Sequence, residues 1–203
     1  MADFEPKARV SPRRSRSAVA DLGQQSKHAL AGRTILQIVP ELQSGGAERA
    51  TIEIAEALAA VGARPLVASF GGRMVSELQA KGGIWHPFPA QTKNPLAMFA
   101  NQRRLIDLIG AEDVALVHAR SRAPAWAAYG AARNTGTPFV TTFHGAYSGT
   151  SGLKKSYNSI MAKGDIVIAN SNFTAERIAE VYPFAQANIR VIRRGVDLRH
   201  FSP

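Results

Sequence analysis

The segment ILQIVPELQSGGAERATIEIAEAL, residues 35–58, decides how the whole chain is interpreted. It passes from a short apolar strand through the pair Gly45–Gly46 into an amphipathic helix with Glu48 in its first turn. Two glycines let a ligand approach the backbone, and the helix start offers unpaired N–H groups and a positive dipole end. The segment therefore predicts either a binding turn for an anion or a sugar, or an ordinary strand-to-helix turn. The helix is supported by residues at spacings of three and four: Ala47, Ala50, Thr51, Ile54, Leu58 and Val61.

The composition of the 203 residues fits one globular domain and excludes several classes of protein. No apolar run approaches the ~20 residues of a membrane-spanning helix. The absence of cysteine excludes disulfides, thiolate metal sites and cysteine nucleophiles, and it fits a cytoplasmic protein. The formal charge of +10 favours polyanionic partners. Because the basic residues are scattered and aromatic residues do not alternate with them, we expect anionic lipid or diphosphate ligands rather than nucleic acid.

The chain divides into a leader, one folded domain and a short final segment. Residues 1–32 are rich in Ser, Arg, Ala and Pro and lack the apolar core of about 7–15 residues that a signal peptide needs. We expect them to form a disordered basic leader, for which a solvated tail is favoured over a binding segment. Residues 33–195 are expected to form the domain, and residues 196–203 the start of a linker.

Strand-like and helical segments alternate along the domain. This alternation with short connections predicts an α/β fold, a Rossmann-like parallel sheet of about seven strands with helices on both faces. Glycines follow four of the helices, as C-terminal stops should: Gly62, Gly82, Gly110 and Gly136. Strands are expected at 34–39, 65–70, 84–88, 114–118, 139–143, 165–169 and 189–192, and helices near 46–61, 73–81, 95–109, 123–134, 152–163 and 171–181.

Two histidines follow strands at the edge of the sheet where ligands bind in such folds. His118 ends the fourth strand and either hydrogen-bonds a loop or has a functional role. His144 follows the fifth strand and is the stronger candidate, because Gly145 comes next. The surrounding segment TTFHGAYSG, residues 141–149, is polar and small, which leaves room for a ligand.

Three further segments each have two interpretations. Ser171 caps the helix after the sixth strand or contacts a ligand. The pair Arg193–Arg194 after the seventh strand meets a phosphate or lies exposed at the edge of the domain. Helix 95–109 combines apolar residues with Arg103 and Arg104, a mixture that suits an anionic membrane surface. Packing against the sheet explains the same apolar residues and is favoured.

Several catalytic and cofactor motifs are missing from the sequence. There is no G-x-G-x-x-G for a dinucleotide, no P-loop, and no G-x-S-x-G hydrolase elbow. Clustered metal-ligand spacings and a D-x-D pair for a metal-bound diphosphate are also missing. We therefore expect no cofactor and no metal, with chemistry that is metal-free or completed elsewhere.

A series of ordered segments resembles the N-terminal domain of family 4 glycosyltransferases, which have the GT-B fold. The resemblance covers roughly residues 33–203. The segments VHARSRAPAW and FHGAYSGT are further similar to transferases of lipopolysaccharide core assembly in Gram-negative bacteria. The matching segments are GGAE at 45–48, VHARS at 117–121, TTFHGAYS at 141–148, YNSIM at 157–161, IVIANSNF at 166–173 and RVIRRGVDLRHFSP at 190–203.

The resemblance implies two Rossmann-like domains with the active site in the cleft between them. The N-terminal domain would mainly bind the acceptor, and the C-terminal domain most of the nucleotide-sugar donor, with retention of anomeric configuration and no metal. Gly45 and Gly46 would place backbone N–H groups near the donor diphosphate and the acceptor. His144 would orient the donor sugar, while electrostatic stabilisation of an oxocarbenium-like centre and the departing diphosphate supplies most of the catalysis. The remaining candidates for acceptor or cleft contacts are Glu48, Arg120, Gly145, Tyr147 and Ser171.

The sequence departs from the family where RGVD–FxP would lead into the second domain. We expect a fragment, a truncated gene product or a half completed by a partner chain, with little transferase activity alone. One function is the acceptor-side half of a retaining glycosyltransferase of cell-envelope or lipopolysaccharide synthesis. Its partners would be a nucleotide-sugar donor, a glycan or lipid-linked acceptor, and the inner face of the cytoplasmic membrane as a peripheral contact. The alternative is a non-catalytic domain that binds a sugar, lipid or protein partner.

Overall fold

The computed structural model describes residues 28–92, 94–145 and 152–195. Most of the expected leader, the expected linker and Tyr147 lie outside these ranges. The last residues of the expected leader, 28–32, form turns against the domain. There the Gly32 N–H donates to the Gly62 carbonyl over 2.8 Å.

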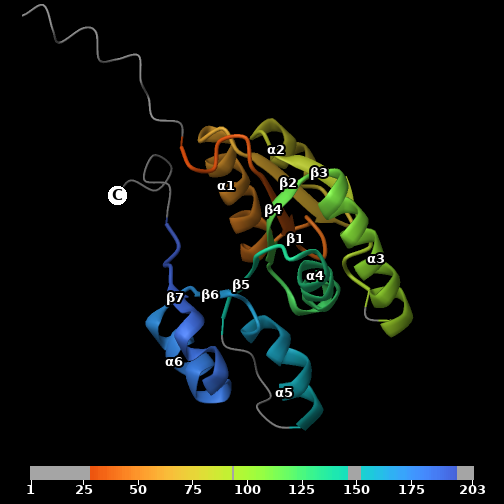
Figure 1. Ribbon diagram of the computed structural model, residues 1–203. Coiled ribbons are helices and arrows are strands. Elements are labelled where there is room, and N and C mark those ends of the chain that lie inside the picture. Colours follow the sequence, from red (N-terminus) through yellow and green to blue (C-terminus); the bar gives the residue numbers. More distant parts are fainter. Residues whose placement is uncertain (1–27, 93, 146–151, 196–203) are drawn as a thin grey trace, which may run out of the picture.

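The strands form one parallel sheet in the order β3-β2-β1-β4-β5-β6-β7. This confirms the predicted Rossmann-like α/β fold (Figure 1). The order reverses between β1 and β4, so ligands are expected beyond the carboxyl ends of these two strands. The strands are β1 (Thr34–Ile38), β2 (Arg64–Ser69), β3 (Ile84–Pro87), β4 (Val114–Ala119), β5 (Phe139–Phe143), β6 (Ile166–Ala169) and β7 (Ile189–Val191).

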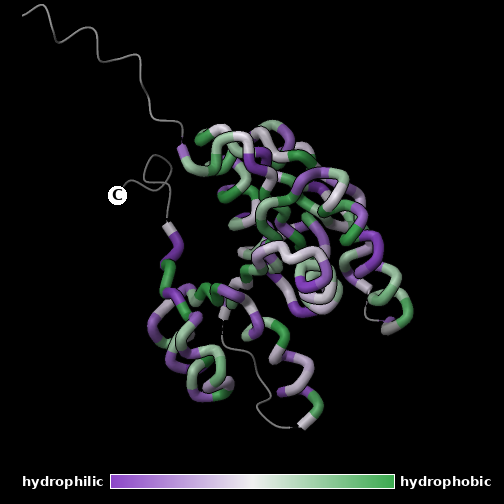
Figure 2. Tube along the Cα trace, viewed as in Figure 1, coloured by the Kyte–Doolittle hydropathy of each residue, from purple (hydrophilic) through white to green (hydrophobic). Residues whose placement is uncertain are grey.

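Helices cover both faces of the sheet. On one face α1 and α2 bury Ile52 and Leu78 against strand residues such as Val67. On the other face the larger core joins α3, α4, η1 and α6, with Leu105 and Ala128 among its members. Hydrophobic and hydrophilic stretches alternate along these helices, as expected of helices with one face on a sheet (Figure 2). The helices are α1 (Gly46–Ala60), α2 (Val75–Ala80), α3 (Pro95–Ala111), α4 (Arg122–Thr135), α5 (Gly152–Asn158) and α6 (Asn172–Val181), with 3-10 turns η1 (Ser159–Ala162) and η2 (Pro183–Asn188).

Three of the predicted glycine stops are confirmed, and the fourth is wrong. Gly62, Gly82 and Gly136 have φ values of +78°, +82° and +70° just after their helices. Gly110 instead lies inside α3, and the left-handed residue after this helix is Asp113, with φ of +46°. Aspartate tolerates this conformation better than most residues, which removes the need for glycine at that end.

Two helices differ from the sequence prediction in other ways. In α1 the buried face is rotated relative to the predicted one. Ile52 and Ala55 are fully buried, while Ile54, which was expected to face the sheet, is 42% exposed. The helix expected near 152–163 is divided into α5 and η1. Periodicity gives the type of element in both places, and packing decides which residues face the sheet.

Helix 95–109 was expected to pack on the sheet, and its second half does so. Leu105, Leu108 and Ile109 are at most 8% exposed. The first turns differ, because Leu96 is 82% exposed and Phe99 57% exposed. Packing therefore explains only part of the apolar surface of α3.

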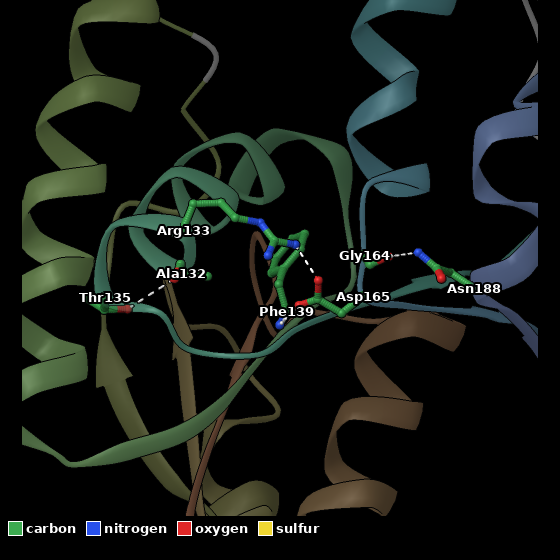
Figure 3. A network of polar contacts seen from close by, with 7 residues as sticks. All are labelled: Ala132, Arg133, Thr135, Phe139, Gly164, Asp165 and Asn188. Atoms are coloured by element: carbon green, nitrogen blue, oxygen red, sulfur yellow. Dashed lines mark hydrogen bonds and ion pairs between the residues drawn. The ribbon is translucent and has the colours of Figure 1, made fainter.

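A polar network ties α4 to strands β5 and β6 on the side away from the loops that follow the strands (Figure 3). The Asp165 carboxylate accepts hydrogen bonds from Arg133 Nη2 (2.5 Å) and from the Phe139 N–H (2.8 Å). Burial opposes ionisation of Asp165, but these bonds outweigh it and lower its pKa. Beside it Asn188 Nδ2 donates to the Gly164 carbonyl over 3.2 Å. The network holds the starts of neighbouring strands in register.

The loop before the glycine turn rests on the loop between β2 and α2. Leu42 donates its N–H to the Gly71 carbonyl over 2.7 Å, and its own carbonyl accepts from the Met74 N–H over 2.9 Å. Gly72 has a φ of +139°, and a Cβ there would lie 2.4 Å from the Leu42 carbonyl oxygen. This close approach of two backbones is possible only with glycine.

We predict opposite effects for alanine at two glycines. Gly72→Ala should lower the free energy of unfolding by about 2–3 kcal/mol, because it adds backbone strain and a clash with Leu42. Gly110→Ala should raise it by about 0.5–1 kcal/mol, because Gly110 is helical and no atom lies within 4 Å of an added Cβ. Urea denaturation measures both, and equal effects would contradict the assigned loop geometry.

Candidate functional site

The turn between β1 and α1 is covered by two charged side chains. Gly45 caps α1 with a φ of +126°, and a Cβ there would lie 2.6 Å from Glu48 Oε2. A Cβ on Gly46 would lie 2.7 Å from Arg194 Nη1. Glu48 therefore folds back over Gly45, while the guanidinium of Arg194 covers Gly46. Both glycines have a steric explanation within the domain, in addition to the ligand role expected from the sequence.

His144 follows β5 and turns its ring toward the same place. Its Nδ1 lies 2.9 Å from Arg194 Nη2. Because a guanidinium can only donate, Nδ1 is the acceptor, and the proton of the neutral ring is on Nε2. Nε2 is buried and has no hydrogen-bond partner among the described residues. A buried donor without a partner is unusual in a folded domain and suits a ligand.

The environment of His144 keeps its ring neutral. Burial, then the positive charges of Arg120 and Arg194, lower the pKa of His144 to about 4. At neutral pH the ring carries one proton, on Nε2, and its Nδ1 lone pair is engaged. The side chain can therefore donate a hydrogen bond to a ligand, and its orienting role stays a prediction.

Arg120 is a buried cation at the end of β4. It is 4% exposed, and its Nε donates to Gln37 Oε1 over 2.8 Å. Burial and then the charge of Arg194 lower the pKa of Arg120 to about 10, while Glu53 acts in the opposite direction, so the guanidinium stays charged at neutral pH. Within the described residues no carboxylate lies within ion-pair distance of Arg120. Its charge is therefore available to attract an anion at this edge of the sheet.

Gln37 connects Arg120 to the first turn of α1. Gln37 is fully buried on β1 and donates through Nε2 to the Thr51 carbonyl over 3.1 Å. The Thr51 hydroxyl in turn donates to the Ala47 carbonyl over 2.8 Å. This chain of hydrogen bonds fixes the buried guanidinium and the glycine turn relative to each other.

Two candidates from the sequence have ordinary partners inside the fold. The Ser171 hydroxyl caps α6 by accepting from the Thr174 N–H over 3.1 Å. Nε2 of His118 lies 2.7 Å from the Thr142 hydroxyl. Burial first, then the charge of Arg120 and the interaction with His144, lower the pKa of His118. These contacts agree with the simpler of the two interpretations for each residue, a helix cap for Ser171 and a hydrogen bond within the fold for His118.

The structure brings Gly46, Glu48, Arg120 and His144 to one edge of the sheet. Gly145 lies next to His144 with no atom within 4 Å of an added Cβ, so its surroundings are open. Tyr147 lies outside the described residues.

Sequence reasoning left three residues of this site out of the candidate list. Gln37 interrupts the apolar run ILQIV, which was the available signal. Asn170 follows β6 and donates through Nδ2 to the His144 carbonyl over 3.1 Å. Arg194 was expected either to meet a phosphate or to lie exposed at the edge of the domain; it is exposed, and it contacts the site through Gly46 and His144.

A pocket of about 670 Å³ lies beyond the carboxyl ends of β1 and β4. This is the point where the strand order reverses, the usual place for a ligand in such a sheet. Its lining mixes charged, aromatic and small residues: Pro40, Glu41, Gln91, Ser121, Arg122, Ala123, Lys154 and Tyr157. Among the described residues no group of three or more potential metal ligands occurs.

Comparison with known families identifies this arrangement. Residues 44–200 match the family described as Glycosyltransferase Family 4. The chain belongs to glycosyltransferase family 4. The match includes the glycine turn, Arg120, His144 and Arg194, while Gln37 lies before the matched range.

Solved structures support the same assignment for this family 4 domain. A glycosyltransferase from Rickettsia africae is 43% identical with a TM-score of 0.74, and the match covers 84% of this chain and 45% of that one. HepE from Anabaena, in complex with UDP and glucose, is 22% identical with a TM-score of 0.63 over 82% of this chain and 46% of its own. MurG from Acinetobacter baumannii is 13% identical with a TM-score of 0.58 over 81% and 46%. The last two show the fold alone.

The family 4 domain spans just under half the length of these solved relatives. No match is found among curated proteins. In the part of the chain that the structure describes, no helix is both long and apolar enough to span a membrane.

We predict that the Gln37 amide holds the buried guanidinium. Gln37→Leu should lower the free energy of unfolding by about 1–3 kcal/mol, because Arg120 Nε loses its acceptor inside the domain. Gln79→Leu on the exposed side of α2 is the matched control and should change stability little. Chemical denaturation of both variants measures the difference, and a Gln37→Leu domain as stable as the control would rule out this role.

Proposed function

We propose that this chain forms the acceptor-side half of a glycosyltransferase that uses a nucleotide-sugar donor. The observation that carries the proposal is the buried, partnerless Nε2 donor of His144 beside Arg120 and the start of α1, inside a family 4 domain. The HepE structures with UDP, UDP-glucose and glucose support a donor of the same class. The acceptor is a glycan or lipid-linked glycan of the cell envelope, with lipopolysaccharide core as the narrower proposal.

Charge stabilisation is the main chemical contribution of this half. Negative charge develops on the departing diphosphate, and the N–H groups at the start of α1 with the buried guanidinium of Arg120 attract it. Glu48 lies over Gly45 and the guanidinium of Arg194 lies over Gly46, so the diphosphate approaches on the side of Gly46, where the covering group is a cation. These fixed positive groups act without a metal, and anomeric configuration is retained.

His144 orients the donor sugar in this proposal. Its Nε2–H donates to a hydroxyl of the sugar, which fixes the ring while the bond to the diphosphate breaks. The lowered pKa of about 4 keeps the imidazole neutral across the physiological range. A neutral donor does not repel the oxocarbenium-like centre, whereas an imidazolium would.

The acceptor occupies the pocket of about 670 Å³ beside this cluster. Its volume suits one or two sugar rings, within the usual range for small-molecule sites. Tyr157 offers an aromatic face, and Glu41 offers a hydrogen-bonding carboxylate. The acceptor hydroxyl would reach the donor sugar at the boundary between pocket and glycine turn.

We predict that His144→Ala removes transfer without unfolding the domain. Turnover should fall by about 100-fold or more, because a contact made to the reacting sugar is lost. UDP- and GDP-sugars are titrated by calorimetry, and sugar transfer to extracted envelope lipids is followed, in the protein that also contains the donor half. The same measurements on this chain alone should show weak binding and little turnover.

The control for that experiment is His28→Ala, an exposed histidine before β1. It should leave binding and transfer unchanged. Unchanged binding and turnover in His144→Ala would remove this residue from the proposed mechanism. Acceptor binding with no transfer, even with the donor half present, would instead favour the non-catalytic binding domain.

The first turns of α3 support a peripheral contact with an anionic membrane. Leu96 and Phe99 are exposed, and the guanidinium of Arg103 lies 5.0 Å from the centre of the Phe99 ring. Exposed apolar side chains beside a cation suit insertion at the level of lipid headgroups. Such a contact would bring a lipid-linked acceptor to the pocket.

We predict that Leu96→Ser with Phe99→Ser weakens binding to vesicles of phosphatidylcholine and phosphatidylglycerol by about tenfold or more. Co-sedimentation measures the bound fraction. Phe184→Ser is the matched control, because Phe184 is 62% exposed and lies in η2, after the far end of α6. Equal binding by the double variant and the control would exclude α3 as the membrane contact.

A further inference from the structure

Arg194 connects the end of the described chain to two parts of the site. Its Nη2 donates to the Gly46 carbonyl over 2.6 Å and lies 2.9 Å from His144 Nδ1. The segment after β7 thereby reaches the start of α1, and Figure 1 shows it leaving the sheet on the side where α1 lies. The preceding arginine, Arg193, instead faces Asn172 Oδ1 at 3.4 Å.

We propose that Arg194 is a positioning residue, which fixes the imidazole of His144 as the Nε2–H tautomer and holds it against the glycine turn. The guanidinium donates a hydrogen bond to Nδ1, which must therefore carry no proton. The only ring proton of the neutral imidazole is then on Nε2. The same guanidinium nitrogen is held by the Gly46 carbonyl. The ring therefore has one orientation and one donor, before any ligand arrives.

The glycine at position 46 is part of this arrangement. A Cβ there would come within 2.7 Å of Arg194 Nη1 and 3.5 Å of its Cζ. Any side chain at this position would push the guanidinium away from the turn, and with it the contact to His144. Gly46 is thus explained by Arg194 as well as by a ligand.

Among the described residues, the charged groups that act on His144 are Arg120 and Arg194, and the titratable His118 at the end of β4 also interacts with it. Both arginines are cations, and both disfavour a second proton on the ring in addition to the effect of burial. Removing the charge of Arg194 leaves burial and Arg120 in place. The pKa of His144 should then rise from about 4 toward its ordinary value of 6.5 without reaching it.

The experiment uses the 203-residue chain with ¹⁵N-labelled histidine, followed by long-range ¹H–¹⁵N NMR between pH 8 and pH 5. In the wild type we expect a neutral ring with its proton on Nε2 and an Nδ1 signal typical of a hydrogen-bond acceptor. In Arg194→Gln the Nδ1 signal should move toward that of a free acceptor, and the ring should titrate at higher pH. Arg194→Lys keeps the charge and should leave the titration low.

Arg193→Gln is the matched control, since it removes a neighbouring charge that contacts neither Gly46 nor His144. It should leave the His144 signals as in the wild type. Gly46→Ala tests the same contact from the other side and should reproduce the change in the Nδ1 signal. Circular dichroism verifies that each variant is folded.

The proposal is overturned if Arg194→Gln leaves both ring signals and the titration unchanged, or if Arg193→Gln alters them equally. The catalytic meaning of this tautomer rests on the proposed function, but the measurement contains no sugar, nucleotide or acceptor. Its failure would leave the turnover test of His144 standing, and a failed turnover test would leave the tautomer assignment standing.

Discussion

The site depends on the absence of side chains at the turn between β1 and α1. Because Gly45 and Gly46 have no Cβ, a carboxylate and a guanidinium from elsewhere in the chain lie directly on the backbone. Two further contacts hold this turn in place. The loop before it rests on Gly72, and the helix after it is bound to Gln37 and Arg120 through Thr51. A change in the turn would therefore disturb every charged group around it.

Like charges gather around this turn, and that arrangement favours an anion. Burial is the largest cause that lowers the pKa of His144 and of Arg120; the charges of Arg120 and Arg194 lower that of His144 further, and Arg194 lowers that of Arg120. Arg120 is buried, which strengthens the repulsion between the two cations, whereas Arg194 is exposed and its charge is partly screened by solvent. A bound diphosphate would offset this repulsion and satisfy N–H groups at the start of α1. The free energy stored in the unliganded cluster then contributes to binding, which is the sense in which such a site is preorganised.

The sequence was sufficient for the fold but only partly for the site. Alternating apolar segments placed every strand of the sheet, since strand and helix periods are local properties. His144 and Gly45–Gly46 stood out because they follow strands. The contacts of Gln37 and Arg194 depend on pairs separated by 83 and 148 residues, which no local pattern reveals. The buried stripe of α1 was misjudged for the same reason, because neighbouring elements decide which side of a helix is covered.

In the proposed transferase, the contacts within this chain and those of a second domain would have separate roles. The described residues of this chain alone fix the tautomer, charge and direction of His144, with no contribution from a donor half. A second domain would then supply the nucleotide and close the cleft, but it would meet a histidine already oriented. Arg194 lies on the segment that leaves the sheet after β7. A shift of that segment would therefore move the guanidinium that contacts Nδ1 of His144. The geometry of His144 is thus coupled to the position of the chain that leads away from the domain.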